Sequence, residues 1–564
     1  MAKKNSLVLL WASSSTFVKR IFSFWLFTVS VLILVACGGG GSDDDTVPSA
    51  SKDSTNTPTA NVILTGKATY TSYPLNANAG IDYSMPAELP IRGAVVELHS
   101  SDGLVLDQQN TSREGFYTFQ APAESNVVVV VKAALGTPQR PDTKIVDNTQ
   151  QQALYTLVMP IRVRAIDLQQ NFNADSGWDG QQYSGIRAAA PFAILDTLHK
   201  SQNLVRSADS NVVFPTLLVN WSKRNIPTFG RIDLGEIGTS HLSSDRQIYI
   251  LGAADVDTDE YDSHIIAHEW GHYFEHAFSR SDSLGGQHIL NDILDPSVAF
   301  SEAWGNAFAA MALDNALYID SMGNRQKIIA ISMDIETNSV PGLTRSSSGI
   351  PIDGFYSEAS IHEILYDLYD SSDDENLQLG FTPIYNALVG KHKTSLAFTS
   401  VFSFIDALLE QDNINDADVR QLAANENIHD GDQYEAFSQK IYTLLPSGGT
   451  RVEQDRNGDT LQTKETYGRI SGNNGNKLDN RIFFKYFSPL SGCYTIDIVP
   501  QSGGDVVIHV PAQANPLDRS GPDGNELYHI TLSANQSGSI AVGSKFSSTK
   551  FSAQMSLTPG QCNE

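Results

Sequence analysis

At 564 residues the chain is too long for one ordinary hydrophobic core, so we expect about three domains. Its composition is that of a globular protein, with 41% hydrophobic residues. The formal net charge of −26 argues against nucleic acid as a partner, because such binding needs a basic surface that displaces counterions from phosphates.

The N-terminus has the pattern of an export signal. Four basic residues within the first 20 precede an apolar run, Ile21–Ala36, that is short for a membrane span. Small residues before Cys37 resemble a bacterial lipobox, which implies a signal peptide over 1–36 and a membrane-anchoring lipid on Cys37. An uncleaved membrane anchor is the alternative. By the same resemblance, Gly38 implies an outer-membrane lipoprotein, with a cell-surface or extracellular location.

A flexible linker and a β-rich region come next. Residues 37–60 are mostly Gly, Ser, Asp, Thr and Pro, with little to bury. From 61 to 165 the pattern predicts strands, among them 94–98, 116–119 and 127–131. The string Pro90–Val96, with Thr111 and Gly115–Tyr117, resembles carboxypeptidase-regulatory-like modules, which implies a β-sandwich scaffold without chemistry of its own.

The pattern changes to mixed α and β from 166 to 446. Two strands are predicted, at 216–220 and 247–251. Five helical stretches are also predicted: 186–204, 263–278, 298–317, 358–369 and 395–409. A strand followed by several helices favours an α+β domain.

The C-terminal region, 447–564, is β-rich again. Its best strand candidates are 481–487 and 493–498, and the pattern weakly resembles sandwich modules appended to secreted bacterial peptidases. If Cys37 carries lipid, Cys493 and Cys562 remain, and an even number in an exported chain suggests one disulfide. Two free buried thiols are the alternative.

The motif His268-Glu269-Trp270-Gly271-His272 carries the strongest chemical signal. Two histidines four residues apart project from one face of a helix and can share one tetrahedral zinc. Glu269 can then act on a water at the metal without binding the metal itself. An ordinary polar helix face is the alternative.

Acidic residues just before this helix suit its positive N-terminal end. Asp255, Asp257 and Asp259 also begin like a calcium loop, but Glu260 occupies the position where such loops require Gly, and Ile266 the position of the final Glu. A calcium ion therefore remains a weaker expectation than zinc.

The third zinc ligand is sought by class. Metzincins continue the motif with Gly and His, where this chain has Glu275 and Phe278. The stretch Phe300–Phe308 instead resembles the gluzincin helix of the fungalysin and thermolysin-like families, which implies that Glu302 is the ligand. In that pattern Asn306 stands where an Asp commonly supports a histidine, which puts that hydrogen bond in question.

Other residues compete for the metal. His264 and His276 extend the histidine row along the helix, but one zinc cannot reach all four. Weaker candidates for the third ligand are Glu275, His288, Asp292 and Asp295.

The resemblance also implies further parts of an active site. With Glu269 as general base, an oxyanion donor is expected near 354–362, where Tyr356 is preferred and His362 is the alternative. The strand that ends at Leu251–Gly252 takes the place of the edge strand that pairs with an extended substrate.

Together these patterns predict a multidomain protein in which a zincin-like α+β metallopeptidase domain is flanked by two all-β sandwich-like domains. Its expected activity is hydrolysis of peptide bonds in a protein or peptide substrate with one catalytic zinc ion. Two alternatives stay open: a cell-surface binding or adhesion protein with a degenerate peptidase scaffold, and a zinc hydrolase of a non-peptide substrate.

Overall fold

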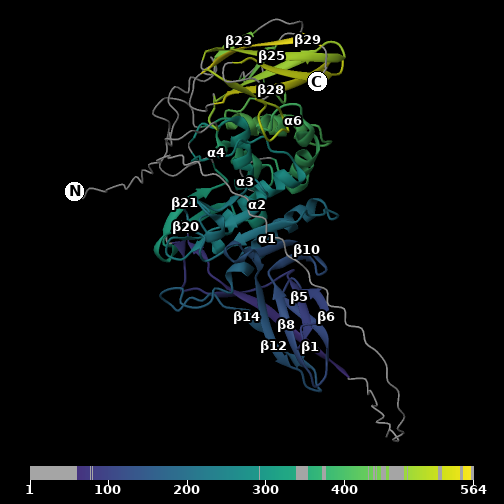
Figure 1. Ribbon diagram of the computed structural model, residues 1–564, viewed down its shortest axis with the longest axis vertical. Helices are drawn as coiled ribbons and strands as arrows, with labels where there is room; N and C mark the ends of the chain where they lie inside the picture. The colour runs from purple at the N-terminus through teal and green to yellow at the C-terminus, as the bar shows by residue number, and fades with distance from the viewer. Residues whose placement is uncertain are drawn as a thin grey trace, which may run out of the picture. The chain divides into compact units, whose positions relative to one another are not determined.

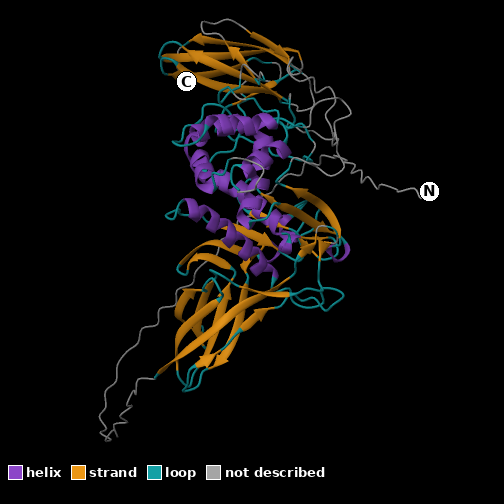
Figure 2. Cartoon of the chain, turned by 180° about the vertical axis from the view of Figure 1, so that it is seen from behind, coloured by secondary structure: helices purple, strands orange, loops and turns teal. Residues whose placement is uncertain are grey.

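The computed structural model describes residues 60–560, except for 77, 79, 291, 338–352, 371–376, 430, 436–438, 440, 446–451, 456–475, 479, 503, 519–523 and 546–550. The predicted signal peptide, Cys37, almost all of the linker and Cys562 lie outside the described residues. The protein is multidomain: helices concentrate in the central part of the chain, and strands dominate the parts before and after it (Figure 2). No described helix is long and apolar enough to cross a membrane.

Two sheets form the first β-rich region (Figure 1). The long strand β1 (Asn61–Ser72) pairs with β4 (Ala87–Pro90), β7 (Phe116–Pro122), β13 (Leu168–Gln169) and β14 (Phe172–Ala174). The other sheet has the order β12 (Thr156–Arg162), β8 (Asn126–Lys132), β5 (Val95–Ser100), β6 (Val105–Asn110). Alternate residues of β7 and β8 are buried in one shared core, as a two-layer β structure requires.

Strands that lie on opposite sides of the predicted boundary at residue 165 pair with one another. β13 and β14 come after it, yet they pair with β1. Conversely, β10 (Arg140–Asp147) comes before it but pairs in parallel with β15 (Leu217–Trp221) of the central sheet. Sequence composition misses this exchange because strand pairing joins segments far apart in the chain.

The central sheet has the order β11 (Ala153–Leu154), β10, β15, β17 (Ile248–Ile250), β16 (His241–Leu242), with β9 (Ala134–Thr137) also paired to β10. β15 and β17 correspond to the two predicted central strands. The prediction that the strand before Gly252 forms the edge is wrong, because β17 lies between β15 and β16. Among the described strands, β16 forms that edge.

Helix α2 (Ser263–Phe278) has the bounds predicted from the sequence. Helix α3 (Pro296–Leu313) begins with Asp295, whose side chain caps the Ser297 N–H, and with Pro at the first position. It ends four residues earlier than predicted because Asp314 takes a left-handed conformation (φ 53°). Leu317 then opens strand β20 (Leu317–Met322), which pairs with β21 (Ile328–Asp334).

The remaining helices complete the central part of the chain: α1 (Ala190–Ala208), α4 (Glu358–Asp367), α5 (Phe381–Ala387), α6 (Val401–Leu409) and α7 (Asp416–Asn425). The helix predicted over 395–409 begins only at Val401, because Ser400 and Ser403 form a reciprocal cap. Helices α2 and α3 pack against each other, and α4 packs against α3 (Figure 1).

Two four-stranded sheets form the C-terminal β-rich region. Their orders are β22 (Tyr442–Leu445), β24 (Arg481–Ser488), β28 (Gln536–Ser544), β26 (Val506–His509), and β23 (Val452–Asp455), β29 (Ser552–Pro559), β25 (Gly492–Ser502), β27 (Glu526–Leu532). Both sheets contribute side chains to one apolar core. Cys493 lies on β25, and its carbonyl accepts a hydrogen bond from the Gly560 N–H, two residues before Cys562. The disulfide between these cysteines stays a prediction.

Candidate metal centre

Helices α2 and α3 approach each other closely beside the histidine motif. The ring of Trp270 stacks on Phe308, and the Trp304 indole N–H donates to the Gly271 carbonyl (3.0 Å). A Cβ added at Gly305 would lie 2.7 Å from the His268 ring, so glycine is needed for the two helices to meet here. This packing brings the motif of α2 against Glu302 of α3.

The structure brings together His268, His272 and Glu302 as the sequence predicts. The two Nε2 atoms of the histidines lie 3.0 Å apart, and each lies 3.5 Å from Oε2 of Glu302. Zinc bonds to nitrogen and oxygen are about 2.0–2.2 Å long, so ligand atoms of a tetrahedral site lie about 3.3–3.6 Å apart. The donor types suit zinc, and both distances to Glu302 match this spacing, while the two nitrogens at 3.0 Å would have to move apart slightly to share one ion.

The outer nitrogen of His268 has a hydrogen-bond partner. Its Nδ1–H donates to Oδ1 of Asn306 (2.9 Å), one turn along α3 from Glu302. The hydrogen bond that the sequence left in question is therefore present, with an amide oxygen in place of a carboxylate. It fixes the tautomer that directs Nε2 toward the other ligands.

The outer nitrogen of His272 faces Glu275. Nδ1 lies 3.5 Å from Oε2 of Glu275, and the same oxygen accepts from the Ser301 hydroxyl (2.5 Å). Glu275 is almost fully buried and lies on the opposite side of the imidazole from Glu302. It orients His272, and the structure does not place it as the third ligand.

The charges within the cluster compensate one another. Burial disfavours the imidazolium of His272, yet the carboxylates around it, Glu302 first and then Glu275 and Glu269, together raise the pKa of His272 well above its usual value. Burial likewise opposes ionisation of Glu302, but His288 and His272 hold the pKa of this carboxyl well below its usual value. The carboxylate is therefore ready to bind a cation, and metal binding would displace the proton from His272.

Glu269 is held beside the ligands by strand β16. Its Oε2 accepts a hydrogen bond from the Leu242 N–H (2.6 Å), which joins the edge strand of the central sheet to the motif helix. No local sequence pattern predicts this contact, because it depends on the pairing of β16 with β17.

Two further side chains reach the cluster from outside the motif. Nε2 of His288 lies 3.4 Å from both Glu302 and Glu358, and the two carboxylates raise the pKa of His288 to about 10 against the opposing effect of burial. The Tyr318 ring, almost fully buried on β20, stands edge-on to His268. Neither Glu358 nor Tyr318 belongs to a recognisable motif.

The two predicted oxyanion donors occupy different surroundings. The Tyr356 hydroxyl donates to the Asp353 carbonyl (3.3 Å). His362 is buried within α4, and this burial lowers its pKa to about 4. Neither role is established by these contacts, so the assignment of the donor stays a prediction.

The other residues considered as metal ligands make contacts outside the cluster. The His264 imidazole donates to the Asn315 carbonyl (2.9 Å), and His276 is exposed. Asp292 pairs with Lys477 (2.7 Å), and Asp295 binds the Arg481 guanidinium through both oxygens (2.6 and 2.8 Å).

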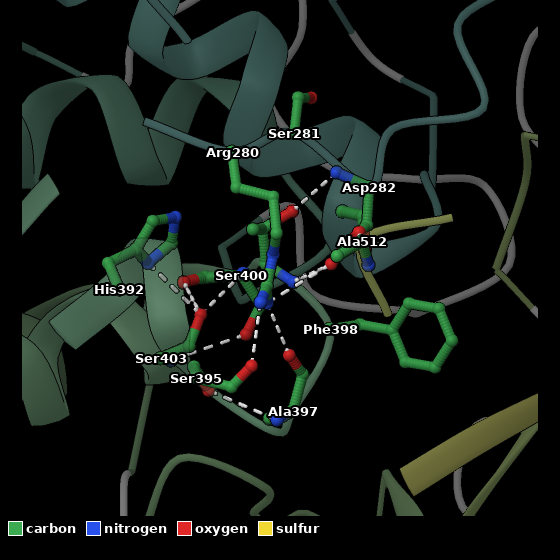
Figure 3. A network of polar contacts seen from close by, with 12 residues as sticks. Arg280, Ser281, Asp282, His392, Ser395, Ala397, Phe398, Ser400, Ser403 and Ala512 are labelled. Carbon is green, nitrogen blue, oxygen red and sulfur yellow. Dashed lines mark hydrogen bonds and ion pairs between the residues drawn. The ribbon is translucent and has the colours of Figure 1, made fainter. Parts of the chain in front are cut away.

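The loop between α2 and α3, which carries His288, is fastened near both ends. At its start, Arg280 donates to the carbonyls of Ser395 and Ala397, and Asp282 accepts from the Ala512 N–H (2.7 Å; Figure 3). The Lys477 ammonium donates to the Gln287 carbonyl at the middle of the loop (3.2 Å) and pairs with Asp292 near its other end (2.7 Å). The C-terminal part of the chain thus helps to fix the loop beside Glu302.

We expect Asn306→Ala to weaken zinc binding by about 10- to 100-fold, because His268 loses the acceptor that orients it. Competition with a fluorescent zinc chelator measures the change. Asn306→Asp is the matched control, since it keeps an acceptor of the same size and should bind zinc at least as tightly as the wild type. An unchanged zinc affinity in Asn306→Ala would contradict an orienting role for Asn306.

No protein-family model and no curated protein matches the chain. Among solved structures, 21% of the chain is similar to the pre-peptidase C-terminal domain of a collagenase from Bacillus anthracis, of which 92% is covered. The sequence identity is 9% and the TM-score 0.14, so the similarity does not define a family.

Proposed function

We propose that the chain is a zinc metallopeptidase of the gluzincin type, with a zincin-like α+β domain. His268, His272 and Glu302 would hold one zinc ion. The observation that carries the proposal is the triangle of their donor atoms, with sides of 3.0, 3.5 and 3.5 Å, beside the Glu269 carboxylate. This arrangement combines a three-residue zinc ligand set with a base that is not a ligand.

Zinc bound there would polarise a substrate carbonyl and lower the pKa of water from 15.7 to about 7. The Glu269 carboxylate would accept the proton of the attacking water and deliver it to the leaving amine. The Leu242 N–H holds Oε2 of Glu269 and so orients the carboxylate for both transfers. Asn306 would orient His268 and Glu275 would orient His272, each through the Nδ1 atom that faces away from the metal.

The position of β16 favours an extended peptide as the substrate. β16 is the edge of the central sheet among the described strands, and its Leu242 bonds directly to the proposed base. An extended chain added to this edge would use main-chain groups other than the Leu242 N–H, which Glu269 occupies, and its peptide bonds would then pass close to Glu269. An ester substrate would not use this edge in the same way.

The proposed cellular location rests on residues outside the described structure. A lipid on Cys37 would anchor the protein in the outer membrane, and the linker 37–60 would hold the catalytic region away from the lipid surface. Mass spectrometry of the mature N-terminus tests whether cleavage occurs before Cys37.

We expect Glu269→Gln to lower hydrolysis of a mixed protein substrate by about 10²–10⁴-fold, the usual contribution of a general base. The variant should still bind one zinc ion, because Glu269 is not a ligand. Cleavage is measured by release of new amino termini, with and without a zinc chelator and after zinc is restored.

Glu114→Gln, which changes an exposed carboxylate on a turn, is the matched control and should keep wild-type activity. A wild type that carries a full complement of zinc and is as inactive as Glu269→Gln would overturn the peptidase proposal.

A further inference from the structure

A second group of carboxylates lies near the start of α2, outside the candidate zinc site. Asp257 comes from the short strand β19 (Asp257–Thr258), Asp259 from the turn that follows, and Asp320 from β20. One carboxylate oxygen from each lies within 4.8 Å of the others. Two oxygens on opposite sides of a calcium ion would be about 4.8 Å apart.

These carboxylates have no compensating positive charge. No lysine, arginine or histidine among the described residues forms an ion pair with Asp257, Asp259 or Asp320. The nearby Arg187 forms its ion pair with Glu260. A buried charge without a partner is costly, so the group needs either protons or a cation.

Two carboxylate oxygens in the group are also without hydrogen bonds. Asp259 is 3% exposed, and although its Oδ2 accepts from the Ser240 hydroxyl, its Oδ1 has no partner. The buried Oδ1 of Asp257 likewise has none. By contrast, both oxygens of the neighbouring Asp262 are satisfied by Ser321. The Oδ1 atoms of Asp257 and Asp259, which have no hydrogen-bond partner, are available to bind a cation.

The electrostatics of the group agree with this geometry. Burial, followed by the charge of Asp257, raises the pKa of Asp320 to about 7. Burial and three neighbouring aspartates raise the pKa of Asp259 well above its usual value. Like charges so close cannot all ionise in the absence of a counter-charge.

We propose that Asp257, Asp259 and Asp320 bind a calcium ion, separate from the zinc held by the histidine motif. The donors are all oxygens, with no nitrogen or sulfur among them, and such a set suits a hard cation such as calcium better than zinc. The buried Oε1 of Gln326, which has no hydrogen-bond partner, is a further oxygen donor in the same part of the fold.

This site differs from the calcium loop considered from the sequence. Asp255 is exposed, and its Oδ1 accepts from the Arg325 N–H instead of joining the group. Asp320, which completes the group, comes from a strand that follows α3. Spacing along the chain therefore could not reveal it.

The ion would brace the elements that surround the motif helix. Asp259 stands just before α2 and bonds to Ser240, which precedes the edge strand β16. Asp320 lies on β20, two residues from Tyr318 and its contact with His268. Calcium would join these elements and remove the repulsion between their carboxylates.

The test uses the full chain loaded with zinc and freed of other cations. Calcium binding is measured by equilibrium dialysis with elemental analysis, and the melting temperature Tm is followed as calcium is added. We expect Tm to rise with calcium at constant zinc content. Asp320→Asn should weaken calcium binding at least about tenfold, because the site loses one charge.

The variant should remain folded without calcium, since a neutral side chain of equal size relieves the repulsion, and its Tm should be no lower than that of calcium-free wild type. The matched control is Asp505→Asn in the C-terminal acidic group, where Lys545 already pairs with Asp505 (2.9 Å) and Asp518 (2.8 Å). This control should keep the calcium effect on Tm.

The proposal fails if wild type binds no calcium at millimolar concentration, or if Asp505→Asn and not Asp320→Asn abolishes binding. Stabilisation by magnesium at least as strong as that by calcium would overturn the calcium assignment. Zinc content and peptide hydrolysis are read separately, so these results do not depend on whether the peptidase proposal holds.

Discussion

Glu302→Ala is expected to release zinc from the protein and to abolish peptide hydrolysis. The substitution removes the only carboxylate of the proposed ligand triangle and leaves two imidazoles, which are too few for a stable structural or catalytic zinc site. Zinc per chain, measured by elemental analysis after dialysis against a weak chelator, should fall from about one to far below one.

Glu275→Gln is the matched control for this substitution. Glu275 contacts the outer nitrogen of His272, so its loss should weaken zinc binding by about 10- to 100-fold and leave the site able to fill at saturating zinc. If Glu302→Ala keeps one equivalent of zinc after dialysis, a different carboxylate is the ligand, and Glu358, which contacts His288, is the alternative.

Arg481→Leu is expected to lower the free energy of unfolding by about 3–5 kcal/mol, which is typical when one partner of a buried ion pair is removed. Arg481 is 5% exposed and Asp295 1%, and the substitution would leave this carboxylate buried without its charge partner. Asp295 also caps α3, so the loss should reach the helix that carries Glu302. Denaturant unfolding measured by tryptophan fluorescence follows the change.

The double variant Asp295→Asn/Arg481→Leu should regain a large part of the lost stability, because the unpaired charge is gone while a capping side chain remains. Arg231→Leu removes an exposed arginine that pairs with Asp233 and should change stability little. A loss from Arg481→Leu as small as that from Arg231→Leu would show that the Asp295 pair does not hold this part of the fold.

Local patterns in the sequence predicted the elements that carry the candidate metal site. The helix over 263–278 was predicted with its observed bounds, because apolar residues and histidines recur with helical spacing after a run of acidic residues. Glu302 could be chosen because its helix resembles a known ligand helix. The structure brings these residues together as expected.

Long-range pairing produced the features that the sequence could not reveal. The edge strand β16 is only two residues long, and nothing in its composition shows that Leu242 contacts Glu269. Asp320 joins Asp257 and Asp259 only because β20 lies near the start of α2. Likewise, His288 reaches Glu302 because the loop is fastened by side chains from the C-terminal part of the chain.

The exchange of strands across residue 165 bears on how the protein could be processed. A protease that cut there and removed the N-terminal piece would also remove β10, the neighbour of β15 in the central sheet. The backbone groups of β15 would become a new exposed edge, which invites pairing with other chains and aggregation. Removal of residues 61–165 would therefore take a strand out of the central sheet and expose the backbone of β15.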